Sequence, residues 1–399
     1  MPALPDGDPA PADGGLPAGL DWDRPLRAYV HVPFCAARCG YCDFNTYTAG
    51  ELGGLHTDEY VVAVRREVEL ATRVARPRPL ASVFVGGGTP SMLSTPQLAG
   101  LLGALRDAFG LQSGAEVTME ANPEDVTPSA LEQWLAAGVN RLSLGMQSAD
   151  PAALRVLDRV HTPGRAQAAA RQARSAGFQH VSLDLIYGIP GQSLGSWRET
   201  VLAALSAQPD HVSAYALGVE EGTALARRIR RGEVPAPDAD LAAAQYDAAD
   251  ELFSDHGLLW YEISNWAQPT GRSEHNLGYW RADNWWGFGP GAHSHVAGVR
   301  WWNVKRPATY QSMLAAGRSP AAGRETLSAD QRHTEAVMLQ VRLAEGFDPS
   351  GFPAATVSDL VGRGWLENAD GARLRLTREG RMLADAVVRV LLWDQGATG

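Results

Sequence analysis

The sequence predicts an α/β fold, in which a partial barrel of the (β/α)6 type is followed by a small α+β module similar to a winged helix. From Arg27 onward, short runs rich in Val, Ile, Leu and aromatic residues alternate with longer amphipathic stretches, as is typical of βα units on a parallel sheet. Polar residues gather after the ends of these runs, where barrels and open parallel sheets build their sites. The last part of the chain has the order helix, hairpin, helix.

Six strands are expected in chain order, with a seventh further on. The runs are RAYVHV at 27–32, ASVFVGGG at 81–88, AEVTMEANP at 115–123, NRLSLGMQS at 140–148, HVSLDLIYGIPG at 180–191, HVSAYAL at 211–217 and LLWYEIS at 258–264. Helices with one apolar face are expected at 58–73, 95–109, 129–137, 162–176 and 196–206. Six or seven such units favour a barrel over a flat doubly wound sheet.

Composition divides the chain into four parts. Residues 1–24, rich in Pro, Gly, Ala and Asp and without the basic and apolar regions of a secretory signal, are expected to form a disordered tail. Residues 25–265 should form the barrel. Residues 266–324 are an aromatic-rich connecting segment with repeated glycines, and residues 325–399 are the winged-helix-like module.

The overall charge limits the classes of partner. The formal net charge is -10, so a general nucleic-acid-binding surface, which would be basic, is not expected. No apolar run approaches the roughly 18 residues that a membrane span needs, so a soluble protein is expected. The 3 cysteines cannot form a complete set of disulfides, which favours a reducing compartment, the cytoplasm.

All three cysteines lie in one loop, CAARCGYC, as Cys35, Cys39 and Cys42. Thiolates at this spacing after a strand can converge on a metal centre, since they suit zinc or iron–sulfur. Zinc would take His31 or His161 as a fourth ligand, although structural zinc sites more often use paired short spacings. Three cysteines offered to a four-iron cluster leave one iron open to a substrate or cofactor. Buried structural cysteines are the remaining alternative.

The CxxxCxxC pattern resembles the cluster motif of the radical S-adenosylmethionine enzymes. GGGTPS at 86–91 is similar to their glycine-rich motif, and the blocks YVHVPFC, GGGTPS, MEANPE, NRLSLGMQS, LDLIYGIPGQ and YALGVEEGT resemble the oxygen-independent coproporphyrinogen oxidase-like branch in order. These blocks cover most of residues 27–225. The resemblance implies a radical SAM barrel, a [4Fe–4S] cluster on the three cysteines and S-adenosylmethionine on the open iron.

The same resemblance implies a set of cofactor contacts. The implied S-adenosylmethionine contacts are Tyr29, Tyr41, Gly87, Gly88, Thr89, Glu120, Gln147, Arg159, Asp184 and Ala216. Each has an ordinary structural alternative: Glu120 could form an ion pair, for example, and Asp184 could cap a helix.

Two groups within this branch have different functions. The coproporphyrinogen III dehydrogenases carry a fourth cysteine two residues after the third, where this chain has Phe44. The resemblance to the HemW-type haem chaperones is closer, because their HNxxYW motif is present as HNLGYW at 275–280. This likeness implies haem binding by His275, Asn276, Tyr279 and Trp280, with the imidazole on the iron and the aromatic rings against the macrocycle. A histidine with a purely structural role is the alternative.

The resemblance therefore implies a haem chaperone that passes haem to an acceptor protein, which could itself be bound to a membrane. An electron donor is implied only if radical chemistry occurs. The alternatives are a radical SAM decarboxylase of coproporphyrinogen III and a zinc-stabilised binding module. His293 and His295 are interpreted as loop polar groups, and the tryptophans at 285, 286, 301 and 302 as core between the barrel and the C-terminal module. Whether the protein is an enzyme, which protein accepts the haem, whether haem is attached covalently and which oligomer forms do not follow from the sequence.

Overall fold

The computed structural model describes residues 5–52, 56–76, 78–159 and 162–393. Its main feature is a strongly curved sheet of 12 strands in the order β12-β11-β10-β9-β1-β2-β3-β4-β5-β6-β8-β7. The strands are β1 (Leu26–Val32), β2 (Leu80–Gly87), β3 (Leu111–Ala121), β4 (Arg141–Gln147), β5 (His180–Tyr187), β6 (His211–Ala216), β7 (Leu259–Glu262), β8 (Asn265–Ala267), β9 (Asn284–Phe288), β10 (His293–Val296), β11 (Val299–Asn303) and β12 (Ala321–Thr326).

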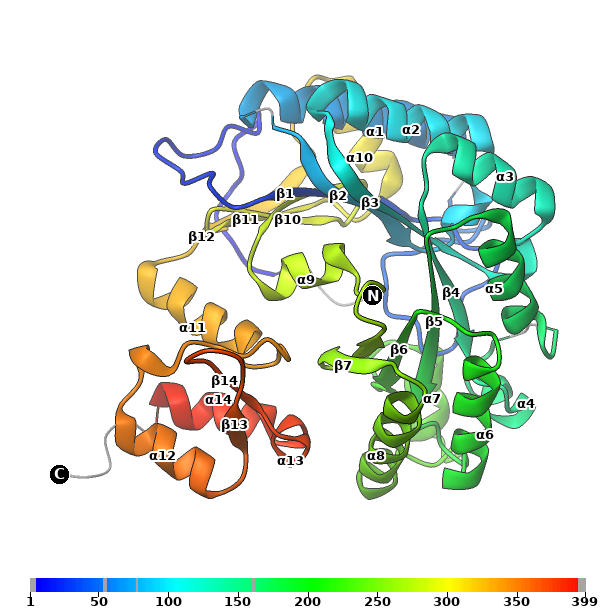
Figure 1. The fold of residues 1–399 in the computed structure, drawn as a ribbon. Coiled ribbons are helices and arrows are strands. Elements are labelled where there is room, and N and C mark those ends of the chain that lie inside the picture. Colours follow the sequence, from blue (N-terminus) through cyan, green and yellow to red (C-terminus); the bar gives the residue numbers. More distant parts are fainter. Residues whose placement is uncertain (1–4, 53–55, 77, 160–161, 394–399) are drawn as a thin grey trace.

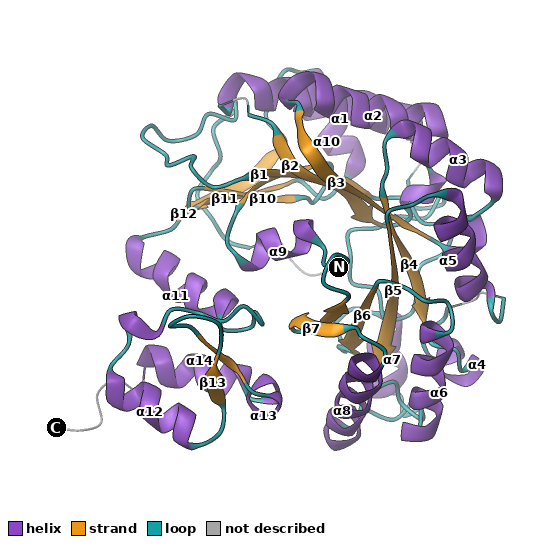
Figure 2. Cartoon of the chain, viewed as in Figure 1, coloured by secondary structure: helices purple, strands orange, loops and turns teal. Residues whose placement is uncertain are grey.

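The first six strands are parallel and form the predicted partial barrel. Helices cover its outer face, and helix α9 lies on its concave side (Figures 1 and 2). The helices of this part are α1 (Thr57–Val74), α2 (Thr95–Phe109), α3 (Pro128–Ala137), α4 (Pro151–Val156), α5 (Arg165–Ala176), α6 (Leu194–Leu205), α7 (Ala224–Arg230), α8 (Ala239–Asp255), α9 (Glu274–Trp280) and α10 (Pro307–Ala315), with short 3-10 turns at Pro90–Met92 and Pro123–Asp125. The expected helices and strands are thus present, with the seventh strand placed antiparallel in a hairpin with β8.

The aromatic-rich segment differs from the expected connection. Its strand β9 pairs in parallel with β1, and β10 to β12 continue the same sheet antiparallel. Trp286 and Trp301, 4.7 Å apart between ring centroids, belong to the core of the barrel and do not lie between barrel and module. The segment is therefore part of the sheet, and glycines with positive φ, Gly289, Gly291 and Gly298, lie in the turns between β9, β10 and β11.

A buried carboxylate joins this segment to the barrel. Glu67 on α1 accepts hydrogen bonds from the backbone N–H of Gly289, at 2.8 Å, from Asn303 Nδ2, at 2.7 Å, and from the Tyr310 hydroxyl. Burial raises the pKa of Glu67 to about 7, although these donors favour the charged form. Helix α1 is thereby connected to β9, β11 and α10.

The expectation of a disordered tail is wrong for residues 5–24. Asp8 forms a two-way backbone bridge with Arg324 on β12, with N–O distances of 2.8 and 2.9 Å, and Trp22 is buried in the main core. A segment rich in Pro and Gly cannot form its own packed element, but its extended backbone can pair with an existing strand edge. Residues 1–4 lie outside the described part of the chain.

The C-terminal module has the predicted helix–hairpin–helix order and a hydrophobic core of its own, which includes Val341, Phe347 and Leu391. Its elements are α11 (Ala329–Gln340), a 3-10 turn (Pro349–Gly351), α12 (Ala354–Gly362), β13 (Leu366–Asn368), β14 (Leu374–Leu376), α13 (Arg378–Met382) and α14 (Ala384–Trp393). The module contacts the barrel where Arg381 pairs with Asp250 on α8, at 2.7 and 2.8 Å. Within the described ranges, no helix is both long and apolar enough to cross a membrane.

Candidate functional site

The concave side of the sheet encloses a cavity of about 590 Å³. The cysteine loop lies at the carboxyl ends of the strands, which we call the mouth, and α9 lies towards their amino ends, which we call the floor. The cavity is lined by all but one of the site residues expected from the sequence: Tyr29, Cys35, Cys39, Tyr41, Cys42, Gly87, Gly88, Thr89, Glu120, Gln147, Arg159, Asp184, Ala216, His275, Asn276 and Tyr279. One cavity therefore joins the two predicted sites.

The glycine-rich motif is required for the cysteine loop to approach β2. A Cβ atom added to Gly88 would lie 2.5 Å from the carbonyl oxygen of Phe34 and 3.1 Å from Cys35 Sγ. The backbone N–H groups of Gly88 and Thr89 donate to the carbonyls of Val32 and Phe34, at 2.8 and 2.7 Å. Gly88 thus allows close contact with the chain's own cysteine loop, whereas the sequence predicts a role in ligand contact alone.

The three thiols face the cavity with polar neighbours. The Thr89 hydroxyl donates to Cys35 Sγ at 3.7 Å, and Arg159 Nη1 donates to Cys39 Sγ at 3.5 Å. Burial raises the pKa of the Cys35 and Cys42 thiols, so in the protein alone these sulfurs hold their protons. Three thiols on one short loop, with a cationic and a hydroxyl donor beside them, form a donor set that fits a soft iron–sulfur centre.

His31, one of the two histidines considered for a zinc site, does not join this group. Both ring nitrogens of His31 are engaged, with the Tyr29 hydroxyl and the Asn45 carbonyl at 2.9 Å each, and His161 lies outside the described residues. Within the described chain, no group of three or more His, Cys, Asp or Glu side chains could hold a single metal ion.

Two partly buried carboxylates face the mouth. Glu120 Oε2 accepts from the backbone N–H of Gly87 at 3.0 Å, and Asp184 accepts from the Ser143 hydroxyl at 2.9 Å. Burial, followed by the nearby charge of Asp184, raises the pKa of Glu120 to about 7, and burial also raises the pKa of Asp184. These carboxylates suit the hydroxyl or amino groups of a bound ligand, because such donors would favour their charged form.

Gln147 at the end of β4 has φ of 63°, a left-handed conformation that is uncommon for residues other than glycine. This end of β4 lies beside Arg159, which donates one hydrogen bond to the carbonyl of Gly145, at 3.3 Å, and another to Cys39 Sγ. Such backbone strain gathers at ligand sites, where the surrounding structure holds it in place.

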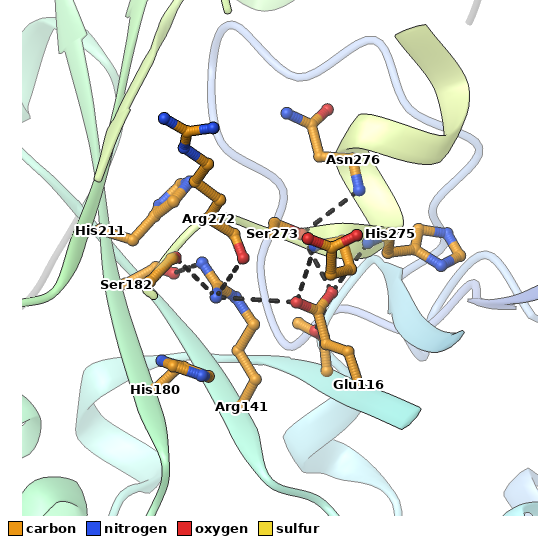
Figure 3. A network of polar contacts seen from close by, with 12 residues as sticks. Glu116, Arg141, His180, Ser182, His211, Arg272, Ser273, His275 and Asn276 are labelled. Atoms are coloured by element: carbon orange, nitrogen blue, oxygen red, sulfur yellow. Dashed lines mark hydrogen bonds and ion pairs between the residues drawn. The ribbon is translucent and has the colours of Figure 1, made fainter. Parts of the chain in front are cut away.

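The floor of the cavity is formed around a carboxylate that caps α9. Glu116 on β3 accepts from the Ser273 hydroxyl and the His275 N–H, at 3.0 Å each, and from the Glu274 N–H at 2.9 Å. Arg141 lies 3.7 Å from this carboxylate and donates to the Ser182 hydroxyl at 3.1 Å (Figure 3). A negative charge at a helix N-terminus stabilises the unpaired N–H groups there.

His275 is nearly inaccessible, with 1% of its surface exposed. Its Nδ1 lies 2.8 Å from Ser82 Oγ and its Nε2 lies 2.9 Å from the Tyr279 hydroxyl. The ring centroid is 5.2 Å from that of Phe84. Burial, followed by the charge of Arg27, lowers the pKa of His275 to about 3, so the imidazole is neutral at physiological pH, as a metal ligand must be.

The other motif residues have different surroundings. Asn276 Nδ2 donates to the Tyr261 hydroxyl at 3.1 Å and to Glu262 Oε1 at 2.7 Å. The Tyr279 ring meets that of Trp285 edge to face, at 4.9 Å. Trp280 is the predicted residue that does not line the cavity, since it packs against a small cluster that includes Leu343 of the C-terminal module.

The sequence prediction missed the floor residues Arg27, Ser82, Glu116 and Arg141. Each lies within a run that predicts a strand, so the sequence pattern indicates a structural role and no site. A signal was present: polar residues repeat at interior positions near the amino ends of neighbouring strands, and Arg27, Ser82 and Glu116 are directly in register.

Comparison with known proteins gives three results. The sequence model of the radical SAM superfamily matches residues 29–204. The heme chaperone HemW of Mycobacterium tuberculosis is 53% identical over 371 residues, which cover 92% of this chain and 95% of that protein. The heme chaperone HemW of Bacillus subtilis is 32% identical over 92% of this chain and 99% of that protein.

Among solved structures, the coproporphyrinogen III oxidase HemN of Escherichia coli, described as a radical SAM enzyme, has a similar fold. The TM-score is 0.80 at 22% identity, and the match covers 94% of this chain and 92% of that one. At this identity the likeness shows the fold alone, and it agrees with the predicted radical SAM barrel followed by a C-terminal module.

Proposed function

The chain belongs to the HemW family of heme chaperones within the radical SAM superfamily, and we propose that it binds haem and transfers it to an acceptor protein. The observation that carries the proposal is that the neutral imidazole of His275 faces the same cavity as the three cysteines. Phe84 and Tyr279 place aromatic surface beside this imidazole. The cavity volume of about 590 Å³ is within the range of small-molecule sites.

We propose that Cys35, Cys39 and Cys42 hold a [4Fe–4S] cluster and that the residues at the mouth hold S-adenosylmethionine. When bound, the cluster would supply the electron that reductive cleavage of S-adenosylmethionine requires. The chain's own residues orient the ligand: Glu120 and Asp184 accept its polar hydrogens, and Arg159 places a positive charge beside Cys39. Trp280, which lies outside the cavity lining, would support α9 and not contact the macrocycle.

Ligation of haem iron by His275 requires one local change. Its Nε2 lies 2.9 Å from the Tyr279 hydroxyl, so the Tyr279 side chain must move away before the nitrogen can bind iron.

The test is an anaerobic haem titration of the full-length protein. We expect a saturable Soret change near one equivalent, weakened at least tenfold in His275→Ala. His293→Ala is the matched control, because His293 lies on β10 outside the cavity lining, and we expect it to titrate like the wild type. An unchanged titration in His275→Ala would remove His275 as the ligand.

A second candidate function is the oxidative decarboxylation of coproporphyrinogen III, which the fold likeness to HemN favours. Against it, Phe44 occupies the place of the fourth cysteine, and its side chain is 59% exposed beside the cavity. Conversion of coproporphyrinogen III to protoporphyrinogen by reconstituted, reduced protein would support the enzyme; S-adenosylmethionine cleavage is measured in the same samples. Iron and sulfide analysis separates both functions from a zinc-stabilised module, which would be colourless.

We propose the cytoplasm as the location, because the cluster needs reduced thiols and reducing compartments maintain them. The partners would be haem, an acceptor that could be membrane-bound, and an electron donor if S-adenosylmethionine is cleaved.

A further inference from the structure

A chain of buried polar groups leads from β9 through β1 and β2 to His275. Asp283 Oδ2 accepts from Arg27 Nε and Nη2, at 3.0 and 2.8 Å. Arg27 Nη1 donates to Ser82 Oγ at 3.0 Å, and this oxygen lies 2.8 Å from His275 Nδ1. Ser82 is fully buried, and the side chains of Arg27 and Asp283 are 6% and 7% exposed.

The two nitrogens of His275 therefore have different kinds of partner. Ser82 lies in the central sheet, where its backbone is in register with Arg27 on β1 and Glu116 on β3. Its hydrogen-bond donor Arg27 is itself held by the ion pair with Asp283. Tyr279 lies on α9 itself, one turn from His275, and its ring also borders the cavity. The Ser82 contact is thus fixed by the sheet, whereas a change of one side-chain torsion would break the Tyr279 contact.

The close approach of Arg27 to α9 depends on the motif residue Gly278. A Cβ atom on Gly278 would lie 1.9 Å from Arg27 Nε and 2.4 Å from Arg27 Cδ. The absence of a side chain at this position allows the guanidinium to lie against the helix and reach Ser82.

We propose that Ser82 is a positioning residue for haem, which holds the Nδ1 side of His275 so that Nε2 is the nitrogen presented to iron. This inference rests on the proposed function. In the ligating form the proton is on Nδ1 and is donated to Ser82 Oγ, and the lone pair on Nε2 faces the cavity once Tyr279 turns away. Partners of this kind orient a metal-ligating histidine, and their loss typically lowers metal affinity about 10–100-fold.

The experiment compares haem binding by full-length variants that differ in one hydroxyl. Ser82→Thr and Ser82→Val have the same shape, but only Thr keeps the hydroxyl; Ser82→Ala removes it without added volume. Ser294→Ala is the matched control, because Ser294 is a buried strand serine that accepts a hydrogen bond, from the Gly287 N–H, and lies outside the cavity lining. Haem affinity, the Soret maximum and ferric spin state, and the rate of haem transfer to excess apomyoglobin are measured, with far-UV circular dichroism as the folding check.

We expect Ser82→Ala and Ser82→Val to bind haem about tenfold more weakly, with a changed Soret maximum and faster transfer. Ser82→Thr and Ser294→Ala should remain within about threefold of the wild type. Equal affinities and spectra for Ser82→Thr and Ser82→Val would overturn the role of Ser82, as would an equal loss in Ser294→Ala. If His275→Ala binds haem like the wild type, the assignment of His275 as the iron ligand fails. If His275→Ala binds haem more weakly while Ser82→Thr and Ser82→Val bind it equally well, only the role of Ser82 fails.

Discussion

Glu116 and Glu120 lie on the same strand, four residues apart, and both belong to the interior of the barrel. At the floor, Glu116 accepts three hydrogen bonds from the start of α9 and lies beside Arg141. At the mouth, Glu120 accepts from the backbone N–H of Gly87, and its pKa rises to about 7. The chain provides the partners of Glu116, whereas a bound ligand would complete those of Glu120.

The same contrast holds for the two ends as a whole. Mouth residues such as Cys39, Gln147 and Asp184 come from loops and strand ends around an open volume. Floor residues form a connected network that holds α9 against the sheet. We therefore expect substitutions at the mouth to remove ligands and leave the fold intact, and substitutions at the floor to reduce stability first.

The largest effect is expected from Cys39→Ala. Anaerobic reconstitution should give essentially no brown iron–sulfur absorbance, since only three cysteines are available and a cluster with an open iron needs all of them. The melting temperature of the unreconstituted protein should hardly change, because Cys39 is only partly buried. Iron and sulfide content per chain measures the first outcome. Wild-type cluster content in the variant would contradict the assignment.

The two glutamates allow a direct comparison. Glu116→Ala should lower the free energy of unfolding by about 3–5 kcal/mol, because the buried Arg141 loses its ion-pair partner and the capped N–H groups lose their acceptor. Glu120→Ala should change it by less than about 1 kcal/mol and weaken S-adenosylmethionine binding about tenfold. Urea unfolding and equilibrium dialysis measure these effects. Equal stability losses in the two variants would remove the distinction between floor and mouth.

Gly278→Ala tests the contact between α9 and Arg27. The added methyl overlaps the guanidinium, so we expect a loss of about 1–3 kcal/mol in the free energy of unfolding. Gly100→Ala on α2 is the control, because its Cβ would meet open space, and alanine in a helix interior should stabilise it by about 0.5–1 kcal/mol. The two glycine-to-alanine substitutions, both within helices, should therefore change the free energy of unfolding in opposite directions. A Gly278→Ala variant that is more stable than the wild type would show that the Arg27 side chain can move away from the added methyl group at little cost in free energy.

The smallest effect concerns pH and Glu67, which belongs to neither end. Its folded pKa of about 7 lies above the ordinary pKa of a glutamate, so the unfolded chain releases this proton more readily and rising pH favours unfolding. Between pH 6 and pH 8 the wild type should lose roughly 1 kcal/mol more stability than Glu67→Gln. Urea unfolding of both proteins at the two pH values measures the difference. Parallel pH dependences would indicate that Glu67 is ionised throughout.

The mouth could be predicted from the sequence because its residues follow strands and match a motif order. The floor could not, because Glu116 and Arg141 acquire their roles only when α9, more than 100 residues later, folds into the concave side. Similarly, Trp280 belongs to the HNLGYW motif, but the helix turns it towards Leu343. The ordered structure of residues 5–24 could not be predicted, because composition indicates only whether a segment is stable on its own. It does not indicate whether the segment can pair with the edge strand of a sheet.

That pairing has a further consequence, because a sheet that does not close into a full barrel keeps two free edges. Unpaired edge strands invite association with other chains. Here Asp8 pairs with Arg324 on β12, and Leu343, which follows α11 in the C-terminal module, pairs with Glu262 on β7. The N-terminal segment and the C-terminal module thus protect the two edges of the sheet, and the isolated barrel segment would expose both and tend to self-associate.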